Sequence, residues 1–131
     1  MSTSAFKISE FMTKSPHLIG MEQSLATAHA VMRKKKIRHL PVLHAGKVVG
    51  LVSQGDLHWV ETLPDVDLDQ VTVEEAMSRD VYGVREDATL RSVVREMARR
   101  KLGSAIVMKG SKVAGIFTTV DALTALEQLL G

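Results

Sequence analysis

The chain has 131 residues, of which 45% are apolar and 24% are charged, and its formal net charge is +2. This is ordinary globular composition, and the length predicts one compact domain. The absence of cysteine excludes disulfide bonds, thiolate metal ligands and cysteine nucleophiles. No apolar run approaches the roughly 20 residues of a membrane helix, and residues 1–10 lack the apolar stretch of a signal peptide. We therefore expect a cytoplasmic protein with no membrane partner.

An internal repeat organises the whole chain. Sliding the sequence over itself gives one dominant register, an offset of 65 residues without a gap. The identical pairs include Glu10 with Glu75, Met12 with Met77, Leu25 with Leu90, Met32 with Met97, Gly50 with Gly115 and Asp56 with Asp121. The register predicts repeat 1 at about 8–61, a linker at about 62–72 and repeat 2 at about 73–130.

Each copy begins with a short extended segment, 17–19 or 81–84, followed by a helix. Ser24 and Thr89 are suitable helix N-caps. In the second copy, apolar residues recur after the cap at i, i+3, i+4 and i+7, which predicts a helix with one buried face. The basic runs at 34–36 and 99–101 then fall at the negative end of the helix dipole, so capping explains much of their clustering.

Two apolar runs follow each helix and predict a β-hairpin. They lie at 37–43 and 47–52 in the first copy, and at 102–108 and 112–117 in the second. Gly110, at the first central position of its turn, suits a type II′ turn. A second helix is expected at 57–61 and at 122–130. The predicted unit is β-α-β-β-α, an α/β (α+β) fold, and the aperiodic residues 62–72 predict a wrapping linker.

Several segments carry a family resemblance. Residues 37–42 (IRHLPV), 46–53 (GKVVGLVS) and Asp56-Leu57 closely resemble the signature of cystathionine-β-synthase (CBS) repeats, and Met12-Thr13 fits the opening of that signature. The second copy resembles a weaker version, in which Ile106 replaces the proline and Gly103-Ser104 replaces the basic pair. From about residue 8 to 130 the chain looks like a bare CBS pair, or Bateman module.

The resemblance implies a pseudo-two-fold pair of repeats with two clefts where the repeats meet. Such modules frequently bind AMP, ADP, ATP or S-adenosylmethionine, commonly form homodimers, and are regulatory rather than catalytic. It therefore implies an adenine nucleotide as ligand, no obligatory cofactor, a separate effector protein as partner, and no enzymatic activity. The alternative is a ligand-free dimerisation or interaction module.

The resemblance also assigns residues to the two clefts, because each cleft takes its Ser/Thr-x-x-Asp from one repeat and its first strand and Arg-His segment from the other. One cleft would combine Thr118 and Asp121 with Thr13, Pro16, Ile37, Arg38 and His39. The other would combine Ser53 and Asp56 with Val81, Tyr82, Gly103 and Ser104.

Asp56 and Asp121 are the candidates for binding ribose, since one carboxylate can accept hydrogen bonds from two adjacent hydroxyls. The same Ser53-x-x-Asp56 and Thr118-x-x-Asp121 patterns are acidic variants of a capping box, which alone would justify both residues. The two roles can coexist, because a helix start also presents free N–H groups to a polar ligand.

Arg38 and His39 begin a strand, so their side chains should point to opposite faces. We expect Arg38 to face the cleft, where a guanidinium can hold phosphate oxygens bidentately. The alternative for both residues is a solvated strand end. Pro41 cannot donate to a sheet ladder and is expected at an edge or ladder end, either to leave room for a ligand or to prevent pairing.

Other functions have less support in the sequence. The five histidines show no metal-ligand spacing, and neither a nucleophile elbow nor a phosphate loop is present. Nucleic-acid binding is not expected, because the basic clusters lie at helix ends and the chain has few aromatic residues for stacking. The last predicted helix carries two neighbouring apolar stripes, which favours burial between two subunits over packing on its own chain alone.

Overall fold

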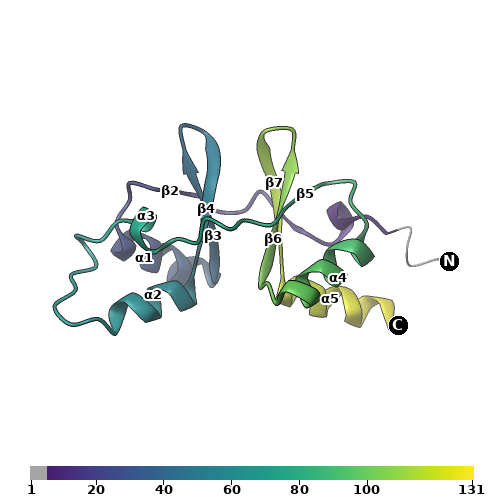
Figure 1. Cartoon of the computed structure of the whole chain (residues 1–131). Helices are drawn as coiled ribbons and strands as arrows, with labels where there is room; N and C mark the ends of the chain where they lie inside the picture. Colours follow the sequence, from purple (N-terminus) through teal and green to yellow (C-terminus); the bar gives the residue numbers. More distant parts are fainter. Residues whose placement is uncertain (1–5) are drawn as a thin grey trace. The chain divides into compact units, whose positions relative to one another are not determined.

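The computed structural model describes residues 6–131, which form two compact units. One unit is residues 17–81, and the other joins residues 82–131 to the N-terminal segment ending at Pro16. Each unit contains one β-hairpin and two longer helices (Figure 1).

The 17–81 unit has a three-stranded sheet in the order β2-β3-β4. The strands are β2 (Ile19–Gly20), β3 (His39–His44) and β4 (Lys47–Ser53), with β2 parallel to β3 and β3 antiparallel to β4. The helices are α1 (Leu25–Lys35), α2 (Gln54–Glu61) and α3 (Val73–Ala76).

The second unit has a four-stranded sheet in the order β1-β7-β6-β5. The strands are β1 (Thr13–Lys14), β5 (Gly83–Arg85), β6 (Ser104–Lys109) and β7 (Lys112–Thr118). The helices are the 3-10 helix η2 (Ile8–Glu10), α4 (Leu90–Arg100) and α5 (Thr119–Leu129). The mixed α/β class and both hairpins are confirmed.

The predicted caps begin the helices α1 and α4. The Ser24 hydroxyl accepts a hydrogen bond from the Thr27 N–H, and the Thr89 hydroxyl accepts one from the Ser92 N–H, each at 3.1 Å. Because Ser53 and Thr118 cap in the same way, α2 and α5 begin immediately after them, three residues before the predicted starts. The predicted starts of these two helices were therefore wrong.

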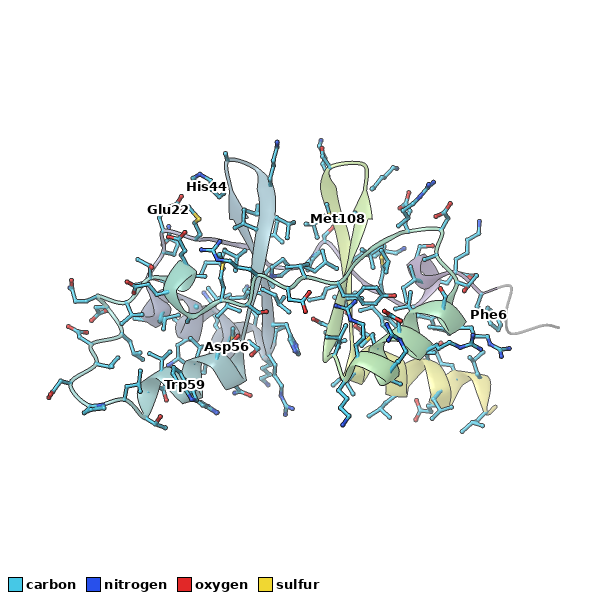
Figure 2. All side chains as sticks on the ribbon, in the orientation of Figure 1. Phe6, Glu22, His44, Asp56, Trp59 and Met108 are labelled. Atoms are coloured by element: carbon cyan, nitrogen blue, oxygen red, sulfur yellow. The ribbon has the colours of Figure 1, made fainter. Side chains whose placement is uncertain are left out.

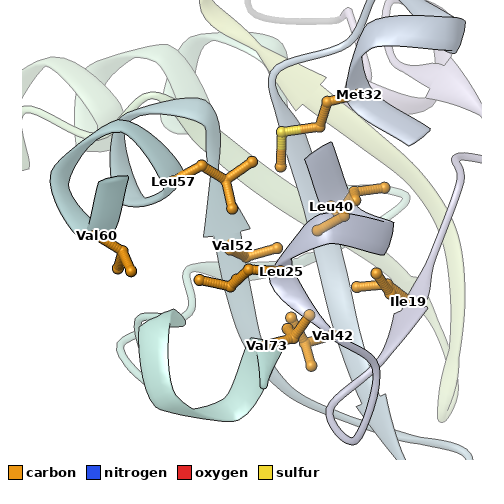
Figure 3. Close-up of a cluster of buried hydrophobic side chains, with 10 residues drawn as sticks. Ile19, Leu25, Met32, Leu40, Val42, Val52, Leu57, Val60 and Val73 are labelled. Atoms are coloured by element: carbon orange, nitrogen blue, oxygen red, sulfur yellow. The ribbon is translucent and has the colours of Figure 1, made fainter. Parts of the chain in front are cut away.

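Each unit has its own apolar core. In the 17–81 unit, Leu25 of α1, Leu57 of α2 and Val73 of α3 meet the inner face of the hairpin (Figure 3). In the other unit, Phe117 of β7 is buried with Ile8, Leu90 and Val93. The linker contributes to the first core, since Val66, Leu68 and Val71 pack against it.

The leading segment of each repeat belongs to the unit that holds the other repeat's hairpin. The Ile8 N–H donates to the Ala88 carbonyl, and the Val73 N–H, 65 residues later, donates to the Gln23 carbonyl, both at 2.8 Å. The strand β1 pairs antiparallel with β7, and Ser78 forms the equivalent bridge with Leu51 of β4. We did not predict η2 and α3, which follow from this exchange, although Thr72 and Glu75 carry a capping pattern, with the Thr72 N–H donating to Glu75 at 3.0 Å.

Two matched glycines make this exchange possible. A Cβ built on Gly50 would lie 2.8 Å from the Ser78 carbonyl oxygen, and one on Gly115 would lie 2.8 Å from the Thr13 carbonyl oxygen. Real Cβ atoms do not come so close, so the paired strand needs glycine at both positions. The repeated Gly50 and Gly115 are thus explained by strand packing.

The two hairpins turn differently. In the first, both central residues have positive φ, 52° for Ala45 and 78° for Gly46, as in a type I′ turn. In the second, Gly110 has φ of 61° and Ser111 has a negative φ. That sign pattern agrees with the predicted type II′ turn.

Candidate ligand-binding site

Asp56 lies at the start of α2 (Figure 2). Its carboxylate completes a capping box with Ser53. The Oδ2 atom accepts hydrogen bonds from the Ser53 N–H at 2.8 Å and from the Ser53 hydroxyl at 3.0 Å. The Ser53 hydroxyl in turn accepts from the Asp56 N–H at 3.2 Å. Within the described residues, Oδ1 has no hydrogen-bond partner, and the side chain is half-buried. The cap therefore uses one oxygen of Asp56 and leaves the other available.

Asp121 repeats this arrangement at the start of α5 with one addition. Its Oδ2 atom accepts from the Thr118 N–H at 2.9 Å and from the Thr118 hydroxyl at 3.2 Å. Its Oδ1 atom accepts from the hydroxyl of Thr13, on β1, at 3.0 Å. The structure thus brings together Thr13, Thr118 and Asp121, three residues that the sequence assigned to one cleft.

Arg38 and His39 lie beside the start of α2, in the same unit as Asp56. The Gln54 N–H donates to the Arg38 carbonyl at 2.9 Å, and His39 is paired across the sheet with Ser53. In the other unit the Thr119 N–H donates to the Gly103 carbonyl at 3.2 Å in the equivalent way. Arg38 is exposed and His39 is half-buried, consistent with alternation along the strand.

The half-buried position of His39 changes its protonation. Burial lowers the pKa of His39 below its ordinary value of 6.5, the negative charge of Asp56 raises it in part, and the positive charge of Arg38 lowers it. Burial has the largest effect, so the neutral imidazole is favoured. His39 is therefore a hydrogen-bonding group near Asp56 rather than a fixed positive charge.

The remaining predicted site residues divide between the units. Pro16 follows β1 in the unit that holds Asp121, and Ile37 precedes β3 in the unit that holds Asp56. Val81 ends the 17–81 unit, whereas Tyr82, Gly103 and Ser104 belong to the other. The crosswise assembly of the two clefts stays a prediction.

Tyr82 has a cationic neighbour within its own unit. The Arg100 guanidinium lies 5.4 Å from the centre of the Tyr82 ring, a cation–π distance. Burial and the negative charge of Glu96 raise the pKa of the Tyr82 hydroxyl, and the charge of Arg100 lowers it. Tyr82 thus keeps its proton at neutral pH and can donate a hydrogen bond. The sequence suggested Tyr82 but not its contact with Arg100.

Pro41 lies inside β3, the middle strand of its sheet, where it pairs with Leu51 of β4. The predicted ladder end is found only on the side of β2. The β2–β3 pairing begins at Val42, while the equivalent β5–β6 pairing begins one residue earlier in the repeat, at Ile106. The Ile106 N–H donates to the Tyr82 carbonyl at 2.9 Å, and a proline cannot make that bond. The proline therefore shortens β2 and leaves the first strand of this repeat unpaired for one residue more.

Two histidines lie close to glutamates on the surface. The His44 Nδ1 atom lies 3.0 Å from the Glu22 Oε1 atom, and the His29 Nδ1 atom lies 3.8 Å from the Glu61 Oε1 atom. Figure 2 shows Glu22 and His44 side by side. Across residues 6–131 no three histidine, aspartate or glutamate side chains gather as metal ligands. No helix in this range has the length and apolar character needed to cross a membrane.

Comparison with known proteins identifies relatives of the whole fold. AcuB from Vibrio cholerae is 30% identical with a TM-score of 0.85, and the match covers 95% of this chain and 93% of that one. The CBS domain pair of protein MJ0100, solved with 5′-methylthioadenosine and S-adenosyl-L-methionine, is 25% identical with a TM-score of 0.80, covering 95% and 99% of the two chains. The CBS domain of a bacterial CNNM/CorC family Mg²⁺ transporter, solved with ATP, is 25% identical with a TM-score of 0.83, covering 95% and 89%.

The curated relatives are longer proteins. They are 24–29% identical to the chain, which spans only 22–45% of their length. The family model of the CBS domain matches residues 8–59 and 73–128, more than half of the chain and one segment in each repeat. The resemblance seen in the signature segments is confirmed, and the chain belongs to the CBS domain family.

Proposed function

We propose that this CBS pair is a regulatory module that binds an adenosine-containing ligand, either an adenine nucleotide or S-adenosylmethionine, and relays its presence to a partner protein. Ligand binding shifts the balance between two arrangements of the module, and an effector protein reads that shift. The module itself carries out no reaction. Its residues need only recognise the ribose, the adenine and the phosphate or sulfonium group of the ligand.

The observation that carries the proposal is that a capping carboxylate uses only one of its two oxygens for the cap. In Asp56, Oδ2 alone satisfies the cap, while Oδ1 has no partner within residues 6–131. The cap therefore leaves the two acceptor positions of Oδ1 open to a ligand. The free oxygen beside a helix start is a strong acceptor for the hydroxyls of a ribose.

Related structures support the ligand class. The MJ0100 pair was solved with two adenosine derivatives, and the transporter domain was solved with ATP. Each of these structures is 25% identical to this chain, and each match covers 95% of it. These ligands share adenosine and differ at the 5′ position. The shared part fits the carboxylates, and the exposed Arg38 suits a phosphate at the variable part.

Isothermal titration with AMP, ADP, ATP and S-adenosylmethionine tests the proposal, using Asp56→Asn and Asp121→Asn beside the unaltered chain. Asparagine keeps one oxygen for the cap but replaces the other with an amide donor. We expect each variant to lose binding at its own site by about tenfold or more, as for a hydrogen bond to a charged group. Thermal unfolding should show that both variants remain folded.

A different result would favour the interaction module without a ligand. In that case none of the four compounds binds in the millimolar range, and Asp56→Asn and Asp121→Asn behave like the unaltered chain. Asp56→Ala and Asp121→Ala would still lose the stability of a cap, about 0.5–2 kcal/mol. That combination would make the two carboxylates purely structural and would overturn the proposed function.

The proposed module acts as a homodimer that buries the outer face of α5 against a second copy. This face is apolar and open, with Val120 62%, Leu123 61% and Leu126 52% exposed. The three residues follow one another at intervals of three along α5, so a two-fold copy of the same face can cover them together. The helix also lines an apolar depression of about 300 Å³ beside Val94 and Ala98 of α4.

Sedimentation of Leu123→Glu against the unaltered chain tests this assembly. Two facing glutamates in an apolar interface should convert the dimer to a monomer. Gln128→Glu, which adds the same charge at an exposed position on another side of the helix, is the control and should remain dimeric. A chain that is monomeric without any substitution, or a Leu123→Glu variant that stays dimeric, would contradict the use of this face.

A further inference from the structure

The two capping carboxylates have different hydrogen-bonding capacity left for a ligand. A carboxylate offers about four acceptor positions, two on each oxygen. In Asp56 the Ser53 N–H and hydroxyl use two of them, both on Oδ2. In Asp121 the Thr118 N–H and hydroxyl use the same two, and the Thr13 hydroxyl uses a third on Oδ1.

Ser78 is the residue of the second repeat that is equivalent to Thr13, but its hydroxyl makes no such hydrogen bond to Asp56 within the described residues. Ser78 lies 65 residues after Thr13, and its backbone pairs with Leu51 as that of Thr13 pairs with Ile116. The Ser78 hydroxyl, however, accepts a hydrogen bond from the Asp80 N–H at 3.3 Å. The backbone exchange is the same in both units, and the side-chain contact to the carboxylate is present in one.

We infer that the Asp56 carboxylate accepts hydrogen bonds from both hydroxyls of a ribose. The Asp121 carboxylate accepts a hydrogen bond from only one of them while the Thr13 hydroxyl donates to its Oδ1 atom. Thr13 is thus the specificity-determining residue that makes the Asp121 site tolerant of a deoxyribose and the Asp56 site selective for a ribose. This inference rests on the proposed function, because it concerns the ligand class of the same two sites.

The difference is a matter of counting donors and acceptors. Two ribose hydroxyls need two acceptor positions, and Asp56 has two left on Oδ1. Asp121 has one left, so the second hydroxyl there must displace Thr13 or donate to its uncharged oxygen, and neither adds a hydrogen bond to the carboxylate. Removing one ribose hydroxyl therefore costs a charge-assisted hydrogen bond at the Asp56 site and little at the Asp121 site.

Titration with AMP and 2′-deoxy-AMP in single-site variants tests this inference. Asp121→Asn retains the Asp56 site, and we expect it to bind AMP about tenfold or more tightly than 2′-deoxy-AMP. Asp56→Asn retains the Asp121 site, and we expect a ratio below about threefold, because no hydrogen bond to the carboxylate is lost. The same ratios should appear with 3′-deoxy-AMP, since either hydroxyl can be the second one.

Thr13→Val in the Asp56→Asn background is the decisive variant, because valine keeps the branched shape and removes the hydroxyl. It should raise the preference of the Asp121 site for AMP to about that of the Asp56 site, at least tenfold. If the Asp121 site is too weak to measure in Asp56→Asn, Thr13→Val must make it measurable with AMP. Ser78→Ala in the Asp121→Asn background is the matched control and should leave the ratio at the Asp56 site unchanged.

The outcomes separate this inference from the proposed function. If AMP and the other adenosine ligands fail to bind the unaltered chain, the proposed function fails and the inference fails with it. If AMP binds, but both single-site variants discriminate equally or Thr13→Val leaves the ratio unchanged, the inference alone is overturned. An Asp121 site that stays undetectable after Thr13→Val also overturns it.

Discussion

The 17–81 unit and the unit that holds β5, β6 and β7 share one layout but differ in how their first strand and helix start are bonded. The strand β5 pairs from Gly83 onward, while β2 pairs one residue later in its repeat because Pro41 lacks an N–H. Asp121 holds Thr13, and Asp56 has an open oxygen. The 17–81 unit thus lacks two hydrogen bonds that the other unit has, one at the start of its first paired strand and one at the carboxylate of its second helix. A duplicated fold can therefore keep its core and change its binding properties through single hydrogen bonds.

The largest expected effect comes from giving the second unit the proline of the first. Ile106→Pro removes the N–H that bonds to the Tyr82 carbonyl and also reduces a side chain that is only 1% exposed. We expect a loss of about 3–5 kcal/mol in the free energy of unfolding, measured by urea denaturation. Ile106→Val keeps the N–H and should cost about 0.5–1.5 kcal/mol. Equal losses of unfolding free energy in the two variants would show that the additional hydrogen bond between β5 and β6 does not stabilise the fold.

The matched glycines test the feature that the two units share. Gly50→Ala and Gly115→Ala each place a Cβ against the carbonyl of a paired strand, at Ser78 or Thr13. We expect each change to lower the free energy of unfolding by about 1–3 kcal/mol, as for overpacking. Gly55→Ala is the control, because its Cβ would meet the Ser53 hydroxyl at an ordinary 3.6 Å, and alanine should stabilise α2. A neutral result at Gly50 and Gly115 would contradict the close pairing.

The helix caps should respond alike in both units, whatever their carboxylates bind. Ser53→Ala and Thr118→Ala remove the hydroxyls that accept from the Asp56 and Asp121 N–H groups. We expect each variant to lose about 1 kcal/mol of stability in urea denaturation. A clearly larger loss in one unit would show that its cap also supports other contacts.

The smallest expected effect is a pH dependence confined to the 17–81 unit, since the residue equivalent to His39 is Ser104 in the other. Burial lowers the pKa of His39 in the folded state below 6.5, so the unfolded chain binds the proton more tightly. The folded chain therefore has its full stability with respect to His39 above about pH 6.5, and it loses this part of its stability as the pH falls toward the folded-state pKa of His39. Urea denaturation from pH 8 to pH 5 should show this decrease. His39→Asn should remove that part of the slope, and an unchanged slope would contradict the role of His39.

Much of the fold could be predicted because its signals are local and occur twice. The caps Ser24 and Thr89, the hairpin turn at Gly110 and the 65-residue register each depend on residues near one another in the chain. The predicted starts of α2 and α5 coincide with apolar residues, Leu57 and Ala122, whereas the caps Ser53 and Thr118 begin each helix nearly one turn earlier. The short elements η2, α3 and β1 were missed because each is stabilised by a distant partner rather than by its own pattern.

The amino-acid sequence was enough to show that the chain has two copies of one β-α-β-β-α unit and that each copy carries a Ser/Thr-x-x-Asp. It was also enough to show the resemblance to CBS domains. The folded structure was needed to show which hairpin each leading segment joins, and that Thr13, but not Ser78, donates a hydrogen bond to a carboxylate. The reason is that an internal repeat records which residues are equivalent, whereas a hydrogen bond between Thr13 and Asp121, 108 residues apart, depends on how the folded chain brings them together.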